Sequence, residues 1–258
     1  MKKVDLCLQN ALLAALAALL FALPIWADHE DDDEMPFSVA KVFFQLNDTD
    51  GDLGFHAIID GEPWKTLEIE SPDEALLLGI RTRSELRLQG LTELRFESAE
   101  PTFDELDPNE FFSRFPEGIY EVEARTLEGG ELESEVEITH VLPAPPENLR
   151  VAGLELPEDC DEDPIPSIAG PLVIRWDPVV SSHPEIGLDG PIEIERYEIS
   201  VEREEPTVLK LVAEVGPGIT EFEVPSELVA SGDEIKFQIL ATDAGGNETS
   251  SESCFIVD

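Results

Sequence analysis

The chain has 258 residues, 42% of them hydrophobic, and its 16 basic and 58 acidic residues give a formal net charge of -42. That length and apolar fraction suffice for one large or two small cores. Because phosphate recognition requires clustered lysine and arginine, the charge excludes nucleic acid as a partner, and it excludes anionic membrane surfaces on the same grounds.

Residues 1–27 are organised like a secretory signal peptide. Lys2 and Lys3 give a positive start, an apolar run covers 11–23, and Ala27 offers a small residue for cleavage. The run is short for a transmembrane span and acidic residues follow it directly, although an uncleaved N-terminal anchor is the alternative. We therefore expect an exported protein, periplasmic or extracellular, with no membrane contact once the signal is removed.

The rest of the chain divides into segments of different composition. Residues 28–37 open with the like-charge run DHEDDDE, which has no apolar periodicity and predicts a disordered segment. Two blocks with strand-like patterns follow, at 38–141 and 147–258. Three prolines in the intervening segment 142–146 favour an extended, semi-rigid linker. We therefore predict two domains joined by a short spacer.

Block 38–141 alternates apolar and charged residues, as an antiparallel sheet with one solvent-exposed face requires. The pattern covers the segments 40–46, 66–70, 93–97, 120–125 and 136–138. One short helix is predicted after Asp107-Pro108, where a cap and a first-turn proline precede three phenylalanines at helical spacing. Segment 115–122 resembles the late hairpin of immunoglobulin-like sandwiches, so we expect an antiparallel β-sandwich with the helix at one end.

Within this block, residues 47–54 (NDTDGDLG) are the most suggestive ligand site. Carboxylates at Asp48, Asp50 and Asp52 can converge on one hard cation, because alternate residues in a tight loop point the same way. The fit to an EF-hand is poor, since its sixth position is Leu53 rather than glycine. The segment is predicted either to bind Ca²⁺ or to be an Asx-rich turn between strands.

Block 147–258 contains short apolar segments separated by turn residues, which is typical of a sandwich. The predicted strands are 172–176, 194–201, 210–215, 221–224, 236–242 and 254–257. The sequons that begin at Asn47 and Asn247 are relevant only if the host glycosylates exported proteins.

The same block resembles fibronectin type III domains over residues 146–258. The matching segments are 146–151 for the first strand, 174–178 for the second, 194–201 for the third, 220–225 for the fifth, and 237–241, before the glycine-rich turn, for the sixth. The resemblance implies an all-β sandwich with Trp176, Tyr197 and Phe237 in its core. It also implies a spacer or binding module rather than a catalyst, which is an argument by analogy.

Two features depart from that family pattern. Ile235 occupies the corner position usually held by tyrosine, and the stretch 154–170 is longer than a normal first turn. Once the signal is removed, the remaining cysteines are Cys160, in that stretch, and Cys254, on the last strand. An even pair in an oxidising compartment predicts a disulfide that pins the insertion down, with two buried free thiols as the alternative.

The sequence shows no nucleophile elbow, phosphate loop, dinucleotide fingerprint or paired zinc-binding histidines, so we assign no catalytic residue and predict that the chain is not an enzyme. We expect an exported binding or structural module with a protein or glycan partner and Ca²⁺ as its one cofactor candidate. The alternative is a polysaccharide-binding accessory protein or hydrolase in which Trp64 stacks on a sugar. A core or edge position is the competing interpretation of that tryptophan.

Overall fold

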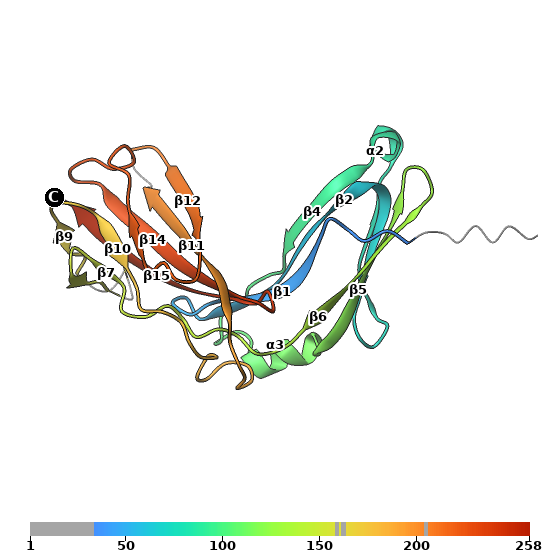
Figure 1. Cartoon of the computed structure of the whole chain (residues 1–258), viewed down its shortest axis with the longest axis horizontal. Coiled ribbons are helices and arrows are strands. Elements are labelled where there is room, and N and C mark those ends of the chain that lie inside the picture. The colour runs from blue at the N-terminus through green and yellow to red at the C-terminus, as the bar shows by residue number, and fades with distance from the viewer. Residues whose placement is uncertain (1–33, 158–159, 161–163, 204–205) are drawn as a thin grey trace, which may run out of the picture. The chain divides into compact units, whose positions relative to one another are not determined.

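The computed structural model describes residues 34–157, 160, 164–203 and 206–258, all within one compact unit that spans 34–258 (Figure 1). The predicted signal peptide and residues 28–33 of the acidic segment lie outside the described residues. The all-β prediction is confirmed, since strands dominate the chain. Within the described part, no helix is long and apolar enough to cross a membrane.

The first block contains six strands and two short helices. They are β1 (Val39–Asn47), β2 (Asp52–Glu70), β3 (Leu76–Arg81), α2 (Ser84–Gln89), β4 (Leu91–Glu97), α3 (Pro108–Arg114), β5 (Gly118–Thr126) and β6 (Glu131–Ile138). The sequence predicts only one helix. It gives no signal for α2, because this helix buries none of its residues and Arg83 makes no side-chain cap bond at its start.

Strand β2 is long enough to belong to two layers (Figure 1). Its first half pairs with β1 on one edge and β4 on the other, whereas its second half pairs with β5 and β3. The register shifts between Asp60 and Trp64, where the strand changes layer. Gly61 lies at this bend, and a Cβ there would stand 3.0 Å from Phe37 and 3.2 Å from Leu132, so the bend favours glycine.

Aromatic side chains fill the core between these layers. The predicted helix α3 is present, and the Asp107 side chain caps it by accepting a hydrogen bond from the Asn109 N–H at 2.8 Å. Its Phe111 and Phe112 are buried, and the Phe112 ring meets Phe44 edge-on at a centroid distance of 5.2 Å. The helix therefore closes the core, which is why three phenylalanines occur at helical spacing.

A tyrosine corner is present in the first block, where the sequence had not predicted one. The Tyr120 hydroxyl, near the start of β5, donates a hydrogen bond of 2.9 Å to the Pro116 carbonyl four residues upstream. That is the bond by which β-sandwich domains fix the approach to a late strand. In the second block Ile235 stands at the corresponding corner and is completely buried.

In the second block the described residues form nine strands. They are β7 (Arg150–Val151), β8 (Leu154–Glu155), β9 (Ser167–Ile168), β10 (Val173–Arg175), β11 (Ile194–Arg203), β12 (Leu209–Val215), β13 (Glu221–Glu223), β14 (Glu234–Asp243) and β15 (Glu248–Val257). The predicted strands all have counterparts at these positions, because their alternating residues do face a core and solvent in turn.

These strands form two facing sheets, with the order β13-β10-β7-β8 in one and β12-β11-β14-β15 in the other. Trp176, Tyr197 and Phe237 lie between the sheets, and each is at most 3% exposed. The indole of Trp176 meets the Tyr197 ring edge-on at 5.4 Å, and the Tyr197 hydroxyl accepts a hydrogen bond from the Val179 N–H. The second block thus has the two-sheet sandwich and the aromatic core that the resemblance to fibronectin type III domains implies.

The two blocks share one sheet, which the sequence does not predict. Strand β1 pairs with β15 in parallel, with Gln45 opposite Glu248 and Asn47 opposite Ser250. The sheet that contains β12, β11, β14 and β15 thus continues through β1 into the first block, and the whole sheet has 11 strands. The domain limits 38–141, 142–146 and 147–258 stay predictions, although separate hydrophobic clusters fill the two blocks.

Candidate functional site

The acidic loop, residues 47–54, is a tight turn between β1 and β2 that lies against β15. The Gly51 N–H donates to the Asn47 carbonyl at 2.9 Å, and the Asp50 N–H donates to the Asn47 side-chain oxygen at 3.3 Å. Gly51 has a φ of 65°, in the left-handed region that glycine adopts without strain. The loop therefore has the Asx-turn geometry that the sequence offered as the alternative to a calcium site.

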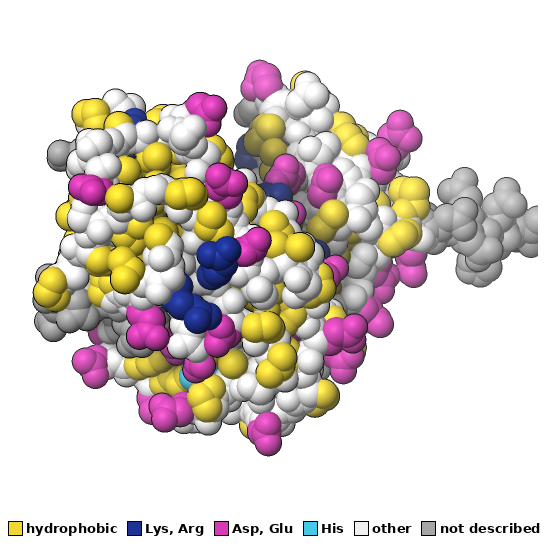
Figure 2. Space-filling view, turned by 60° about the vertical axis from the view of Figure 1, so that its left-hand side comes forward, with side chains coloured by type: hydrophobic (Ala, Val, Ile, Leu, Met, Phe, Trp, Pro, Cys, Tyr) yellow, Lys and Arg dark blue, Asp and Glu magenta, His cyan; other side chains and the backbone are white. Residues whose placement is uncertain are grey.

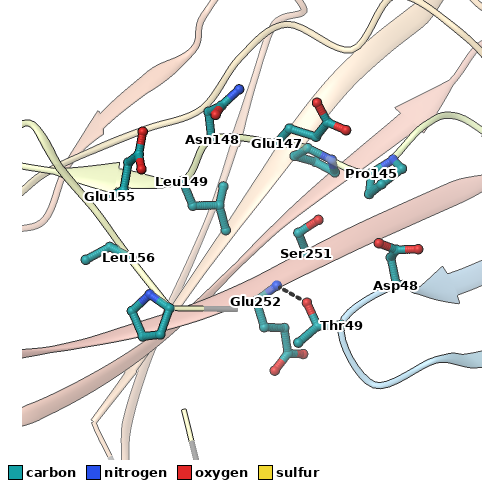
Figure 3. A pocket seen from close by; sticks show the side chains of 12 residues that line it. Asp48, Thr49, Pro145, Glu147, Asn148, Leu149, Glu155, Leu156, Ser251 and Glu252 are labelled. Carbon is teal, nitrogen blue, oxygen red and sulfur yellow. Dashed lines mark hydrogen bonds between the residues drawn. The ribbon is translucent and has the colours of Figure 1, made fainter. Parts of the chain in front are cut away.

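Three hydrogen bonds join this loop to β15. The Asp48 N–H donates to the Ser250 carbonyl at 3.0 Å, and the Glu252 N–H donates to the Thr49 hydroxyl at 2.9 Å (Figure 3). The Asn47 amide nitrogen donates to the Glu252 carboxylate at 3.0 Å. The loop thus extends the parallel pairing of β1 and β15 beyond the end of β1, and it belongs to the contact between the blocks.

The Asn247 side chain makes the other half of this contact. Its amide oxygen accepts from the Phe44 N–H at 3.0 Å, and its amide nitrogen donates to the carbonyls of Thr139 and Val141, each at 2.9 Å. Asn247 is 2% exposed. One amide therefore joins β1, the end of the first block and the β14–β15 turn. The sequence identifies this residue only as part of a glycine-rich turn and of a sequon, and its burial leaves no free amide for a glycan in the folded chain.

Two of the three predicted calcium ligands, Asp48 and Asp50, face different partners. The Asp48 carboxylate lies 2.9 Å from the Nε2 atom of His183, and the Asp50 carboxylate accepts from the Asn47 amide at 3.0 Å. Among the described residues, no group of three or more His, Cys, Asp or Glu side chains is arranged to hold a metal ion. The Ca²⁺ site at Asp48, Asp50 and Asp52 stays a prediction.

His183 fixes the orientation of Asp48. The backbone N–H groups of Glu185 and Ile186 donate to its Nδ1 atom at 3.1 and 2.8 Å. Since Nδ1 accepts, Nε2 carries the proton and donates it to the Asp48 carboxylate. His183 is buried, and its loop is thereby held against the acidic loop by a single directed hydrogen bond.

Asp52 is partly buried, whereas Asp48 and Asp50 of the acidic loop are exposed. Burial and, after it, the negative charges of Glu100, Asp50 and Glu252 together raise the pKa of this carboxyl group to about 6. A cation or a proton near Asp52 relieves that repulsion. We therefore expect the stability of this loop to depend on salt and on pH near neutrality.

A cavity of about 500 Å³ opens beside the acidic loop (Figure 3). Its wall contains both carboxylates and apolar side chains: Asp48, Glu147, Glu155 and Glu252 among the former, Pro145, Leu149, Leu156 and Pro157 among the latter. Such a wall suits a ligand that combines positive charge with aliphatic surface, as a lysine or arginine side chain does.

The predicted disulfide is confirmed. Cys160 is bonded to Cys254, with the two Cα atoms 6.0 Å apart. The Ser253 hydroxyl also donates to the Pro157 carbonyl at 2.7 Å. The inserted stretch is thereby attached to β15 next to the cavity, on the strand that also receives the acidic loop.

Trp64 is completely buried in the core of the first block. Its indole therefore presents no face to a sugar, and the core interpretation of this tryptophan is the one that holds. The alternative function that relied on Trp64 loses its only named contact residue.

No family model and no curated protein matches this chain. Similar solved structures include a two-domain fibronectin type III segment of chicken tenascin, with 10% identity, a TM-score of 0.30, and 85% of this chain and 98% of that chain covered. They also include the FN1–FN3 domains of chicken CNTN1, with 9% identity, a TM-score of 0.32, and 86% and 69% covered.

A third similar structure is a cytokine receptor complex, with 12% identity, a TM-score of 0.27, and 84% of this chain and 96% of that chain covered. TM-scores of this size assign no role to any residue. The description of the second block as fibronectin type III-like therefore rests on its strand order and on the core around Trp176 and Tyr197.

Proposed function

We propose that the protein is an exported, non-catalytic binding or structural module whose two blocks act as one rigid element. The observation that carries this proposal is the parallel β1–β15 pair, reinforced by the acidic loop and by Asn247. Sandwiches joined only by a linker move independently by default. Here β1 of the first block is hydrogen-bonded into the sheet of the second block. A rigid connection of this kind suits a module that holds its binding surfaces at a fixed distance from each other.

Calorimetry of the full chain tests the coupling. We expect one cooperative transition for the native chain, because each core can open only after the shared sheet breaks. Asn247→Asp keeps the size of the side chain but replaces two donors with a carboxylate facing two carbonyls, so it should split the transition in two. Asn109→Asp, at an exposed position on α3 whose amide bonds to Asp107 of the same block, is the matched control and should leave one transition. Two transitions in the native chain would refute the rigid coupling.

Export is supported by the disulfide, which persists in oxidising compartments, together with the signal-like start of the sequence. Fractionation of cells producing the full chain, with N-terminal sequencing of the product, tests this. We expect a chain that begins at residue 28 outside the cytoplasm. A reduced, full-length chain in the cytoplasm would contradict export.

The partner we propose is a protein with a basic segment that enters the cavity beside β15. Glu147 and Glu155 line this cavity from the second block, and the net charge attracts cations over longer distances. Figure 2 shows acidic side chains spread over one face of the molecule, so charge alone attracts a polycation anywhere. A test must therefore distinguish binding at the cavity from attraction by the net charge of the whole chain.

A matched pair of variants makes that separation. Glu147→Gln/Glu155→Gln removes two charges from the cavity, and Glu135→Gln/Glu137→Gln removes two from the exposed strand β6. Titration with a lysine-rich peptide should show weaker binding for the cavity variant than for the β6 variant. Equal loss in both would mean that the peptide reports only net charge.

Calcium binding at the acidic loop is a second candidate, favoured by the crowding of Glu100, Asp50 and Glu252 around Asp52. Thermal unfolding in Ca²⁺ and in NaCl at matched ionic strength decides it. A specific site gives a larger rise in Tm with Ca²⁺, which Asp50→Asn abolishes. Equal rises in both salts would show that screening, rather than a site, relieves the repulsion.

The polysaccharide alternative requires binding on a glycan panel, for which Trp64 provides no contact.

A further inference from the structure

The main strand path of the shared sheet ends in β12 on one side and β6 on the other, while β3, β4 and β9 pair beside that path. An edge strand presents unpaired backbone groups to other chains, so natural sheets protect their edges with charge or cover. In the described part of the chain, β12 is hydrogen-bonded only to β11. The two edges can therefore be compared for the protection that each carries.

Strand β6 is protected in both ways. Glutamates occupy alternate positions from Glu131 to Glu137, so they share one face of the strand. The backbone of Met35 also pairs with β6, receiving and donating hydrogen bonds of 2.9 and 3.1 Å. Pairing of two β6 strands would place like charges opposite each other and is disfavoured.

Strand β12 carries charges of opposite sign, Lys210 and Glu214, which do not oppose pairing with a second copy as the glutamates of β6 do. The β12 sequence LKLVAEV places Lys210, Val212 and Glu214 on the exposed face, whereas Leu211, Ala213 and Val215 are half-buried. Val212 is 52% exposed and the preceding Val208 is 63% exposed. In a chain of this charge, exposed apolar residues on an edge strand indicate a surface that pairs with another chain.

We propose that two copies of this chain associate by antiparallel pairing of β12 with β12 about a twofold axis through Val212. In this register Lys210 lies opposite Glu214 of the second copy, and the symmetry repeats that pair at the other end. Val212 lies opposite its own counterpart. Each cross-strand pair on the exposed face is thus either oppositely charged or apolar, and both kinds stabilise a sheet.

The register is specific, because neighbouring registers lose both charge pairs. A twofold axis through Leu211 would place Lys210 opposite Val212, and an axis through Ala213 would place Glu214 opposite Val212. Only the axis through Val212 pairs the two charges. A twofold interface repeats each contact, so one self-complementary strand suffices to close a dimer without forming a fibre.

The net charge of the chain determines the conditions under which the pair forms. Two copies of net charge -42 repel over the Debye length, which is about 10 Å at 0.1 M salt. The Lys210–Glu214 contacts act at shorter range and are screened less. We therefore expect more dimer as the NaCl concentration rises, the opposite of an association held by general charge attraction.

Sedimentation of the full chain at about 50 mM and about 500 mM NaCl tests this dependence. Lys210→Glu places two acidic pairs across the interface and should weaken dimerisation by about tenfold or more. Glu214→Lys should weaken it similarly. The double variant Lys210→Glu/Glu214→Lys restores opposite charges at both positions and should recover the dimer.

Contacts within one chain cannot explain such a recovery. Lys210 lies 3.9 Å from Glu202, and Glu214 lies 3.2 Å from Arg196, so the double variant loses both of these pairs. A chain that stays monomeric in both salts, or a double variant as weak as the single ones with an unchanged Tm, would overturn the proposal.

Cross-linking tests the register without altering charge. Val212→Cys places one thiol from each copy on the twofold axis, where directly opposite Cα atoms lie roughly 4.5–5.5 Å apart, within disulfide range. Mild oxidation should give a covalent dimer at high salt. Val180→Cys, at a loop position that is 80% exposed, is the matched control and should cross-link far more slowly. Equal rates would show random collision rather than pairing of β12.

Discussion

Two turns meet at the contact between the blocks, and they differ in what the sequence reveals. The acidic loop attracts attention through its charge, yet its carboxylates are partly exposed and satisfied within the loop and by His183. The glycine-rich β14–β15 turn looks like an ordinary hairpin connection, yet its Asn247 is buried and holds three backbone groups of the other block. A neutral amide in the right geometry matters more to this contact than three charged side chains.

The largest effect should come from Asn247→Ala. It leaves the Phe44 N–H and the carbonyls of Thr139 and Val141 buried without their partner, and each loss costs about 1–3 kcal/mol. We expect the free energy of unfolding in urea to fall by about 3–5 kcal/mol. Asn47→Ala in the acidic loop should cost about 1 kcal/mol. Equal losses of unfolding free energy in the two variants would show that both turns contribute equally to the contact between the blocks.

The next largest effect concerns the other end of β15. Cys160→Ser/Cys254→Ser opens a link between positions separated by 94 residues, and removal of such a bridge costs about 2–4 kcal/mol. The expected loss should be additive with Asn247→Ala, since the two sites attach different ends of the strand. Strong non-additivity, measured by urea unfolding of the combined variant, would mean that the insertion and the contact between the blocks form one unit.

The two turns also predict a pH dependence. Burial raises the pKa of Asp243, in the β14–β15 turn, to about 6, and burial raises that of Asp52 in the acidic loop to about 6. A raised folded-state pKa contributes stability below the unfolded value, near pH 4, and that contribution is lost as the pH rises through 6. The Tm should therefore be higher at pH 5 than at pH 8.

Glu248 acts in the same direction. Burial raises its pKa to about 7, while the Thr242 hydroxyl and the Arg196 guanidinium oppose the shift. Asp243→Asn should reduce the rise in Tm between pH 8 and pH 5 and leave the rest to Glu248 and Asp52. A Tm that falls on acidification over this range would contradict the assigned burial of these carboxyl groups.

The smallest effect should come from Asp52→Asn. Removing one charge beside Glu100 and Glu252 relieves repulsion, so stability should rise by less than about 1 kcal/mol at low salt. The gain should disappear in high salt, where the charges are already screened. Thermal unfolding at two NaCl concentrations measures it. A gain that persists in high salt would point to packing rather than charge.

The sequence predicted the second block well, because its strands alternate and Trp176, Tyr197 and Phe237 face the core as that alternation requires. It could not predict the β1–β15 pair, since the two strands lie about 200 residues apart and nothing local specifies a parallel neighbour. The role of Asn247 was equally hidden, because it depends on where the first block places its backbone. The corner formed by Tyr120 had a local signal, the segment 116–120, that was read only as a hairpin.

The direction of the β1–β15 pair has a mechanical consequence. When the two ends of the chain are pulled apart, the force acts on the start of β1 and on the end of β15. Because these strands are parallel, the force slides them past each other, and the three register pairs from Gln45 to Asn47 are loaded together in shear instead of opening one after another. A chain held at its two ends should therefore yield at high force and then lengthen abruptly, with the sequence between β1 and β15 released behind that short contact.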